Sequence, residues 1–131
     1  MTDQRSLRVL FVDDETAIVT LIVRGLTRLG HTVSGFSDPR LALDEFRKAP
    51  DAFDVVITDL AMPNMSGFAF SRAVHETRAD VPILLMSGFV TQEDERTSAA
   101  CAIRDIIFKP ITLSKLGDAL SRLSTGAAPG A

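Results

Sequence analysis

The chain has 131 residues, of which 46% are hydrophobic, and a formal net charge of −3. This is enough apolar material for one domain with a single core, and the acidic balance provides no basic stripe of the kind that binds nucleic acid. The single cysteine excludes an internal disulfide, and the apolar runs are too short to span a bilayer. We therefore expect a cytoplasmic chain with a polar segment at 1–6, one domain at 7–123 and a flexible tail at 124–131.

The first predicted helix follows an apolar strand at Leu7–Val12. Apolar residues recur at three- and four-residue spacing across Thr16–Leu29, which predicts an amphipathic helix, and Gly30 is a typical residue to end it. The inner face of this helix is expected to carry Ile18, Leu21, Ile22, Gly25, Leu26 and Leu29.

Strand and helix patterns then alternate along the chain. The predicted elements are a weak strand at His31–Gly35, a helix capped by Asp38 and ending near Lys48, a β-branched strand at Val55–Thr58, a helix after the loop Ala61–Gly67, a strand at Ile83–Met86, a helix begun by Thr91–Asp94, a strand at Ile106–Phe108 and a helix capped by Thr112. The helix after Thr91 has little apolar surface, and we expect it to be the mobile element. The repeats predict an α/β fold, a doubly wound five-stranded parallel sheet with helices on both faces, although the pattern leaves the strand order open.

Four of the apolar runs end in residues suited to phosphate and metal chemistry: Asp13-Asp14, Asp59, Ser87 and Lys109. In an open parallel sheet the carboxyl ends of the strands meet at one edge, where ligands bind. Three carboxylates held there would repel one another, and a hard divalent cation such as Mg²⁺ is the natural neutralising partner. A carboxylate can also attack phosphorus, while an ammonium and a hydroxyl can hold phosphoryl oxygens.

Each of these residues also has a simpler interpretation. Asp13-Asp14 alone fits a solvated turn, and Asp59 alone fits a helix cap or a turn. Ser87 alone fits a turn residue, and Lys109 alone fits an exposed lysine at a strand end. Their joint occurrence at successive strand ends favours phosphoryl transfer over a set of unrelated turns.

In order, spacing and strand context, these residues resemble the receiver domain of two-component response regulators, the CheY-like superfamily. The resemblance spans Leu7 to Leu123, and the matching positions are Asp13-Asp14, Asp59, the loop Met62–Gly67, Ser87 and Lys109-Pro110. It implies the flavodoxin-like three-layer α/β/α fold with five helices and the strand order 2-1-3-4-5.

The resemblance also implies a chemistry. Asp59 would accept a phosphoryl group from the phosphohistidine of a histidine kinase or a histidine phosphotransfer domain, and Lys109 and Ser87 would contact that group. Mg²⁺ would bind to Asp14, Asp59 and the backbone carbonyl of Ala61, with Asp13 acting mainly through water. Such a domain is a self-phosphorylating acceptor with slow autodephosphorylation rather than a turnover enzyme. It would signal to an output partner through its fourth helix, fifth strand and fifth helix, as a monomer or weak dimer, without contacting nucleic acid or membrane.

Three positions depart from the family pattern. Ile106 stands where the family usually has the Tyr or Phe that couples the site to the output surface. Cys101 occupies a place where the family usually has Gly, and Ile111 one where Phe is frequent. The Ile106 departure predicts that output through this surface is altered or weak.

Two other functions stay open. A phosphohydrolase of the haloacid dehalogenase type also uses an aspartyl nucleophile with Mg²⁺, but it needs a second Asp two residues later, where this chain has Ala61. A receiver-like binding module that is never phosphorylated would have no need of an intact acidic site. His75-Glu76 faintly resembles the phosphoaccepting box of sensor kinases, yet the following Pro-Leu is missing. We therefore expect a solvated His75 and a strand-edge His31, neither with a catalytic role.

Overall fold

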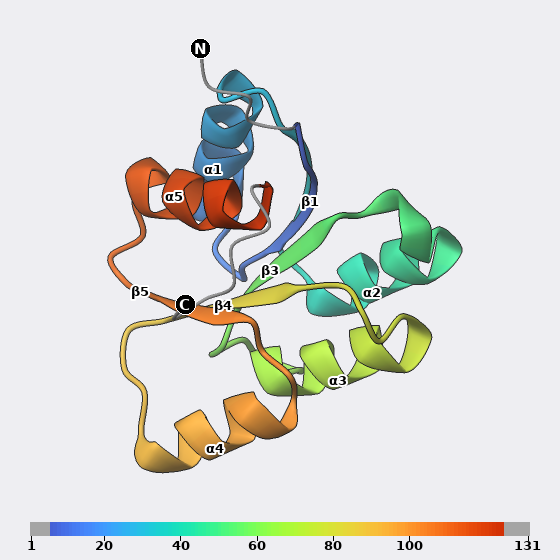
Figure 1. Ribbon diagram of the computed structural model, residues 1–131, viewed down its shortest axis with the longest axis vertical. Coiled ribbons are helices and arrows are strands. Elements are labelled where there is room, and N and C mark those ends of the chain that lie inside the picture. The colour runs from blue at the N-terminus through green and yellow to red at the C-terminus, as the bar shows by residue number, and fades with distance from the viewer. Residues whose placement is uncertain (1–5, 125–131) are drawn as a thin grey trace.

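The computed structural model describes residues 6–124 and contains one parallel sheet (Figure 1). Its strands are β1 (Arg8–Val12), β2 (Thr32–Phe36), β3 (Val55–Asp59), β4 (Ile83–Ser87) and β5 (Asp105–Phe108). The strand order is β2-β1-β3-β4-β5, which confirms the predicted fold class and topology. Of the predicted terminal segments, 1–5 and 125–131 lie outside the described residues.

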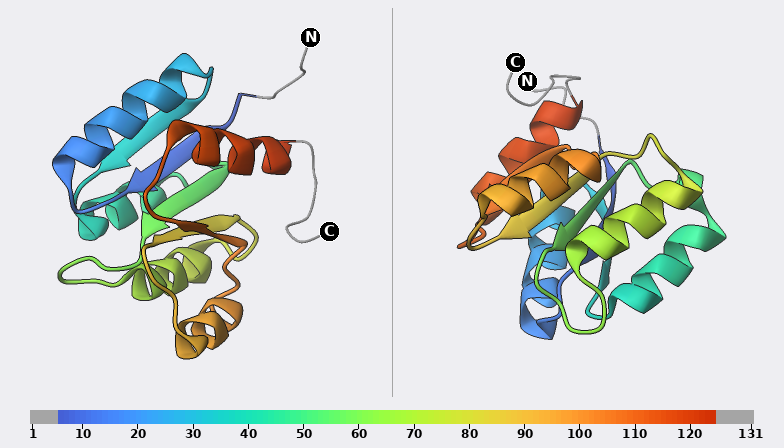
Figure 2. Two further views of the ribbon diagram at one scale, coloured as in Figure 1. Left: turned by 90° about the vertical axis from the view of Figure 1, so that its left-hand side faces the viewer. Right: turned by 90° about the horizontal axis from the view of Figure 1, so that it is seen from below.

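Helices cover both faces of this sheet, as Figures 1 and 2 show. They are α1 (Thr16–Arg28), α2 (Pro39–Lys48), a short 3-10 turn η1 (Pro50–Ala52), α3 (Gly67–Thr77), α4 (Gln92–Ala100) and α5 (Leu113–Ser124). The predicted caps are present, because Asp38 accepts a hydrogen bond from the Arg40 amide and Thr91 forms a capping box with Asp94. None of the helices within residues 6–124 is long and apolar enough to cross a membrane.

The strands alternate their side chains between two cores, one on each face of the sheet. On the first face α1 and α5 pack against the sheet, with Val9, Phe11, Ile57, Met86, Leu26, Leu116 and Leu120 fully buried. On the second face α2 and α3 pack against it, with Leu10, Val12, Val56, Ile83, Phe46, Phe70 and Val74 fully buried. Because both faces are covered, β3 and β4 are buried along their whole length.

The predicted inner face of α1 was partly wrong. Leu21 and Leu29 are 59% and 51% exposed, and Val19, which was not assigned to this face, is buried. The row that contacts the sheet consists of Val19, Ile22 and Leu26. The apolar stripe in the sequence is wider than the contact with the sheet, so its rim faces solvent.

Helix α4 has the weakest attachment by burial. Its only buried residue is Ser98, as its apolar-poor sequence predicted. The chain leaves α4 through Ala102, whose φ of 55° lies in the left-handed region that favours glycine. Cys101, the position discussed above as a usual glycine, has a φ of −89° and therefore has no such requirement.

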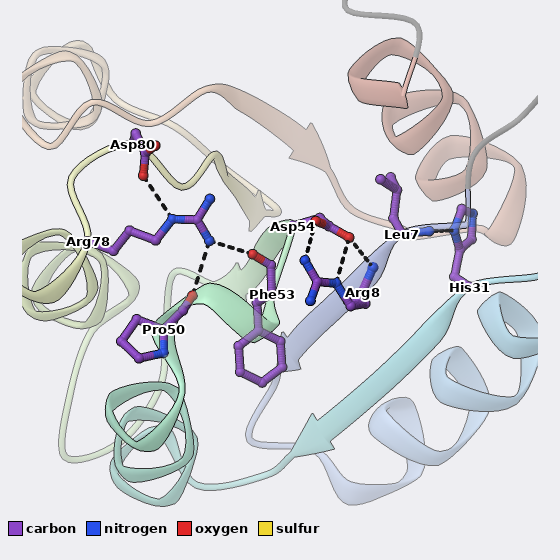
Figure 3. Close-up of polar contacts among 8 residues, drawn as sticks. All are labelled: Leu7, Arg8, His31, Pro50, Phe53, Asp54, Arg78 and Asp80. Atoms are coloured by element: carbon purple, nitrogen blue, oxygen red, sulfur yellow. Dashed lines mark hydrogen bonds and ion pairs between the residues drawn. The ribbon is translucent and has the colours of Figure 1, made fainter.

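Polar contacts stabilise the end of the sheet where the strands begin (Figure 3). Arg8 forms an ion pair with Asp54 at 2.9 Å, so the starts of β1 and β3 are joined. The Arg78 guanidinium donates to the carbonyls of Pro50 and Phe53 and pairs with Asp80. It therefore links the end of α3 to the segment that leads into β3.

The prediction for His75 needs correction. His75 is half-buried rather than solvated, with Nδ1 3.2 Å from the Cys101 carbonyl oxygen and Nε2 3.0 Å from that of Val81. His31 directly precedes the edge strand β2, in line with its predicted strand-edge position, and it is buried, with its Nδ1 accepting a hydrogen bond from the Leu7 amide at 3.1 Å. Burial lowers the pKa of His31. The local sequence pattern could not show these contacts, because each joins a ring nitrogen to a backbone atom six to 26 residues away.

The start of α3 is packed directly against the end of β3, which gives a test of this geometry. A methyl group added at Gly67 would overlap the Asp59 carbonyl oxygen and lie 2.9 Å from the Leu60 Cα. Both are backbone atoms that cannot rotate away, so Gly67→Ala is expected to lower the free energy of unfolding by about 1–3 kcal/mol. Chemical denaturation with the linear extrapolation measures this change.

Gly117→Ala is the matched control. It adds the same methyl group inside α5, where the nearest atom is a Leu29 methyl at an ordinary 3.5 Å. Helix propensity should make this variant as stable as wild type or slightly more so. Equal stability of the two variants would contradict the close approach of Gly67 to β3.

Candidate functional site

Strand pairing brings the four predicted strand-end positions to one edge of the sheet. Asp59 and Ser87 are the last residues of β3 and β4, and Asp13 and Lys109 directly follow β1 and β5. The ladder continues past the strand ends, because the Asp13 amide donates to the Phe36 carbonyl at 3.2 Å and the Lys109 amide donates to the Ser87 carbonyl at 2.8 Å. The backbone at these positions is thus fixed by the sheet rather than by flexible loops.

Three carboxylates form a cluster at this edge. Asp13, Asp14 and Asp59 each offer an oxygen atom, and these atoms all lie within 4.8 Å of one another. Asp13 and Asp59 are 2% and 3% exposed, whereas Asp14 is exposed. An all-oxygen donor set that is open on one side fits Mg²⁺, which usually keeps several waters and binds few protein carboxylates.

Lys109 supplies the positive charge of the cluster. Its Nζ lies 3.0 Å from Asp59 Oδ1, and its side chain is 34% exposed. The peptide bond from Lys109 to Pro110 is cis. Among residues 6–124 this is the one ion pair that involves a member of the carboxylate cluster.

Burial and mutual repulsion shift the ionisation of these groups. Burial raises the pKa of Asp13 to about 6, although the Glu15 amide hydrogen bond opposes the shift and the Asp59 charge adds to it. Burial also raises the pKa of Asp59, against the hydrogen bond and charge of Lys109. Burial lowers the pKa of Lys109, but the hydrogen bond and charge of Asp59 and the charge of Asp13 outweigh it, so this pKa lies above its usual value. The carboxylates are therefore held in a site that favours their neutralisation.

Ser87 points into the loop that follows β4. Its Oγ donates to the Phe89 carbonyl oxygen at 2.7 Å and accepts from the Phe89 amide at 3.3 Å. Ser87 is 6% exposed, and the hydrogen bonds of its hydroxyl are made within its own loop. Any turn of this side chain towards Asp59 has to break both bonds and release the backbone at Phe89.

The loop after β3 is also anchored by its backbone. The Leu60 amide donates to the Met86 carbonyl, and the Gly67 amide donates back to the Leu60 carbonyl. Ala61 is exposed between these two anchors. The part assigned to its carbonyl remains a prediction.

Glu15 is a neighbour of the site that the sequence analysis did not single out. Its amide donates to Asp13 Oδ1 at 2.9 Å, which orients that carboxylate by a short Asx-type turn. Its own carboxylate contributes to the raised pKa of Lys109. The run Asp13-Asp14-Glu15 was the available signal, because an Asp in the turn before a helix commonly accepts a hydrogen bond from the backbone amide two residues later.

A groove of about 220 Å³ opens beside the cluster. It runs between α1 and the segment after β5, and its lining residues are Asp13, Glu15, Ile18, Leu21, Ile22, Lys109, Pro110 and Ile111. One end of the groove is thus charged and the rest is apolar. The exposed Leu21 of α1 belongs to this surface rather than to the core.

Known proteins share both the sequence pattern and the architecture. The response regulator receiver domain family matches residues 9–121. The chemotaxis protein CheY4 of Vibrio cholerae has 32% sequence identity and a TM-score of 0.83, over 90% of this chain and 98% of that chain. Sensor protein EvgS of Escherichia coli K12 is 31% identical over 94% of this chain and 10% of its own length. The two-component response regulator ARR14 of Arabidopsis thaliana is 32% identical over 84% of this chain and 29% of its own length.

The chain therefore belongs to the family of response regulator receiver domains, which act in two-component signal transduction. It spans less than a third of the length of the two curated relatives named above. The family match covers the strands, apart from the first residue of β1, and all four strand-end positions described here.

The shifted pKa of Asp13 predicts how stability depends on pH when no metal is added. The folded state keeps the Asp13 proton up to a pKa of about 6, whereas a carboxyl with the usual pKa of 3.8 has lost it. The folded state binds more protons in this window, so the free energy of unfolding should fall as the pH rises through it. Relative to Asp13→Asn, wild type should lose about 1–3 kcal/mol between roughly pH 4 and pH 6.5.

Denaturant unfolding in the presence of a chelator measures both curves. Asn at position 13 retains an acceptor for the Glu15 amide and removes only the ionisation. Comparison of the two curves also cancels the contributions of other acids, such as Asp38, whose pKa is lowered by its hydrogen bond to Arg40. Parallel curves for the two proteins would show that Asp13 does not titrate in this window.

Proposed function

We propose that this chain is a phosphoacceptor, and that Asp59 takes a phosphoryl group from the phosphohistidine of a histidine kinase or a histidine phosphotransfer domain. The observation that carries the proposal is the 3.0 Å contact of Lys109 Nζ with Asp59 Oδ1 inside a cluster of three carboxylates. A buried acid with a positive partner in contact and two further acids close by suits the handling of a phosphoryl group and a divalent cation.

The reaction is a simple displacement. A carboxylate oxygen of Asp59 attacks phosphorus, the P–N bond of the phosphohistidine breaks, and its electron pair returns to the imidazole, which takes up a proton. The product is an acyl phosphate on Asp59. Lys109, freed from part of its contact with the carboxylate, then holds one phosphoryl oxygen, and the Ser87 hydroxyl can donate to another.

The acidic cluster would hold Mg²⁺ through Asp14, Asp59 and the Ala61 carbonyl, with Asp13 acting mainly through water. When bound, the ion would neutralise charge on the phosphoryl oxygens and on the cluster. The raised pKa of Asp13 and that of Asp59 support this assignment, because they report carboxylates in need of a counter-charge. Phosphorylation adds further negative charge of about −1.5 to −2, which increases that need.

We propose that the donor docks in the groove beside the site. The groove places apolar side chains of α1, including the exposed Leu21, next to Lys109. A donor that presents its phosphohistidine from an apolar helix face would match this arrangement. Relatives named as a sensor protein and as a response regulator are consistent with such a donor.

A turnover phosphohydrolase is the second candidate, and we do not favour it. Its acid/base Asp would stand two residues after the nucleophile, where this chain has the exposed Ala61. We therefore propose slow autodephosphorylation rather than turnover. A binding module that is never phosphorylated is also disfavoured, since the Lys109 contact and all three carboxylates are in place.

The output step would begin at Ser87. If the hydroxyl turns to the phosphoryl group, it gives up its two hydrogen bonds to Phe89 and loosens the start of the segment that leads into α4. Helix α4 buries only Ser98, so its displacement costs little. We propose that the changed surface comprises α4, β5 and α5, and that it binds an output partner.

The first test of this function is the formation of the acyl phosphate. Wild type incubated with Mg²⁺ and acetyl phosphate should gain one phosphoryl group in its intact mass, and Asp59→Asn should gain none. Removal of the metal by a chelator should slow the reaction at least about tenfold. Asp44→Asn, on the exposed side of α2, removes one acid elsewhere and should behave as wild type.

The outcomes separate the candidate functions. A wild-type chain without an adduct, or an undiminished adduct on Asp59→Asn, would refute the acceptor role of Asp59. Continued release of phosphate over many turnovers would identify a hydrolase instead. A small molecule serves as the donor here, so the result does not depend on finding the natural kinase.

Hydrogen exchange tests the proposed mobile element. Amides of α4 should exchange at least about tenfold faster than those of α1, because α1 buries four residues and α4 buries one. Phosphorylation should change the protection of the segment from Gly88 to Thr91 in wild type and not in Ser87→Ala. Equal protection of α1 and α4, or an unaltered response in Ser87→Ala, would contradict this output route.

A further inference from the structure

Lys115 makes two contacts that bracket the site lysine. Its Nζ donates to the Phe108 carbonyl at 2.9 Å and to the Pro110 carbonyl at 2.9 Å. These are the carbonyls of the residues immediately before and after Lys109. The ammonium of one lysine thus fastens the short backbone segment that carries the other.

Lys115 lies at an unfavourable position for a positive charge in its helix, which bears on the role of these two contacts. It lies in the first turn of α5, where its amide donates to the capping hydroxyl of Thr112 at 3.1 Å. A positive side chain at this end of a helix opposes the helix dipole. Within residues 6–124 Lys115 forms no ion pair with a carboxylate. The favourable interactions of its ammonium are therefore those with the two loop carbonyls.

The segment that Lys115 holds has few other backbone constraints. On the inner side the Lys109 amide donates to the Ser87 carbonyl of β4. On the outer side β5 is an edge strand, so no neighbouring strand takes up its carbonyls. Pro110 has no amide hydrogen to donate. Lys115 supplies the outer attachment that the sheet does not provide.

We propose that Lys115 is a positioning residue for Lys109: by holding the carbonyls on both sides, it fixes where the Lys109 ammonium meets Asp59. This inference rests on the proposed function, since it concerns the geometry of the same acceptor site. A lysine side chain has a long flexible stem, so the location of its ammonium depends on a fixed backbone. Displacements of about 1 Å in a catalytic group can cost large factors in rate.

The test compares rates of phosphorylation by acetyl phosphate at saturating Mg²⁺. Lys115→Met keeps the length of the stem and removes the donors, and it should slow adduct formation at least about threefold. Lys115→Arg can donate to both carbonyls and should restore most of the rate. Lys48→Met removes an exposed lysine from α2 and should react as wild type.

A double variant separates positioning from a general structural effect. If Lys115 acts through Lys109, the variant Lys109→Met/Lys115→Met should react no more slowly than Lys109→Met alone. A wild-type rate in Lys115→Met, no restoration by Lys115→Arg, or a further loss in the double variant would overturn the inference. A wild-type chain that forms no adduct would instead overturn the proposed function and this inference with it.

Discussion

The structure depends most on one electrostatic constraint, the clustering of three carboxylates at the carboxyl edge of the sheet with one ammonium in contact with Asp59. Asp13 and Asp59 are almost completely buried, and burial disfavours the charge of each. Lys109 offsets part of this at 3.0 Å from Asp59. The arrangement persists because Asp13, Asp59 and Lys109 are each at, or one position beyond, the end of a paired strand, where the ladder fixes the backbone. The strand register therefore holds these carboxylates together against their mutual repulsion.

The fold class and the convergence of the strand ends were predictable because both follow from local patterns, whereas the strand order could be expected only from the family resemblance. Short β-branched and apolar runs define strands such as β3, three- and four-residue spacing defines helices such as α1, and a run boundary marks where a side chain leaves the sheet. The rotation of α1 was not predictable. Leu21 satisfies the same periodicity as Ile22, and only the position of the helix on the sheet decides which of them is covered.

Within the site, the residue types were predictable and their partners were not. The sequence places a hydroxyl at Ser87, but its choice of Phe89 as partner depends on the turn that the loop adopts. The same limit applies to Lys115 and His75, whose contacts are with backbone carbonyls that carry no sequence signature. Contacts between a side chain and a remote backbone atom are invisible to periodicity, and here they supply much of the fixed geometry.

Although Ile106 stands where the family usually has an aromatic residue, the same strand carries an aromatic side chain two positions later, at Phe108. Side chains two positions apart on a strand share a face, so Phe108 lies on the same face of β5 as Ile106. Ile107 lies between these two residues and is buried on the opposite face. Phe108 is also the residue directly before Lys109. Both line a groove against α4 together with Val90 and Ser98, whose hydroxyl has no hydrogen-bond partner among the described residues. Phe108 is connected to the site through its backbone, because it directly precedes Lys109 and its carbonyl accepts a hydrogen bond from Lys115. A displacement of Lys109 would therefore be passed to Phe108 through the backbone, without the need for a rotating ring at position 106.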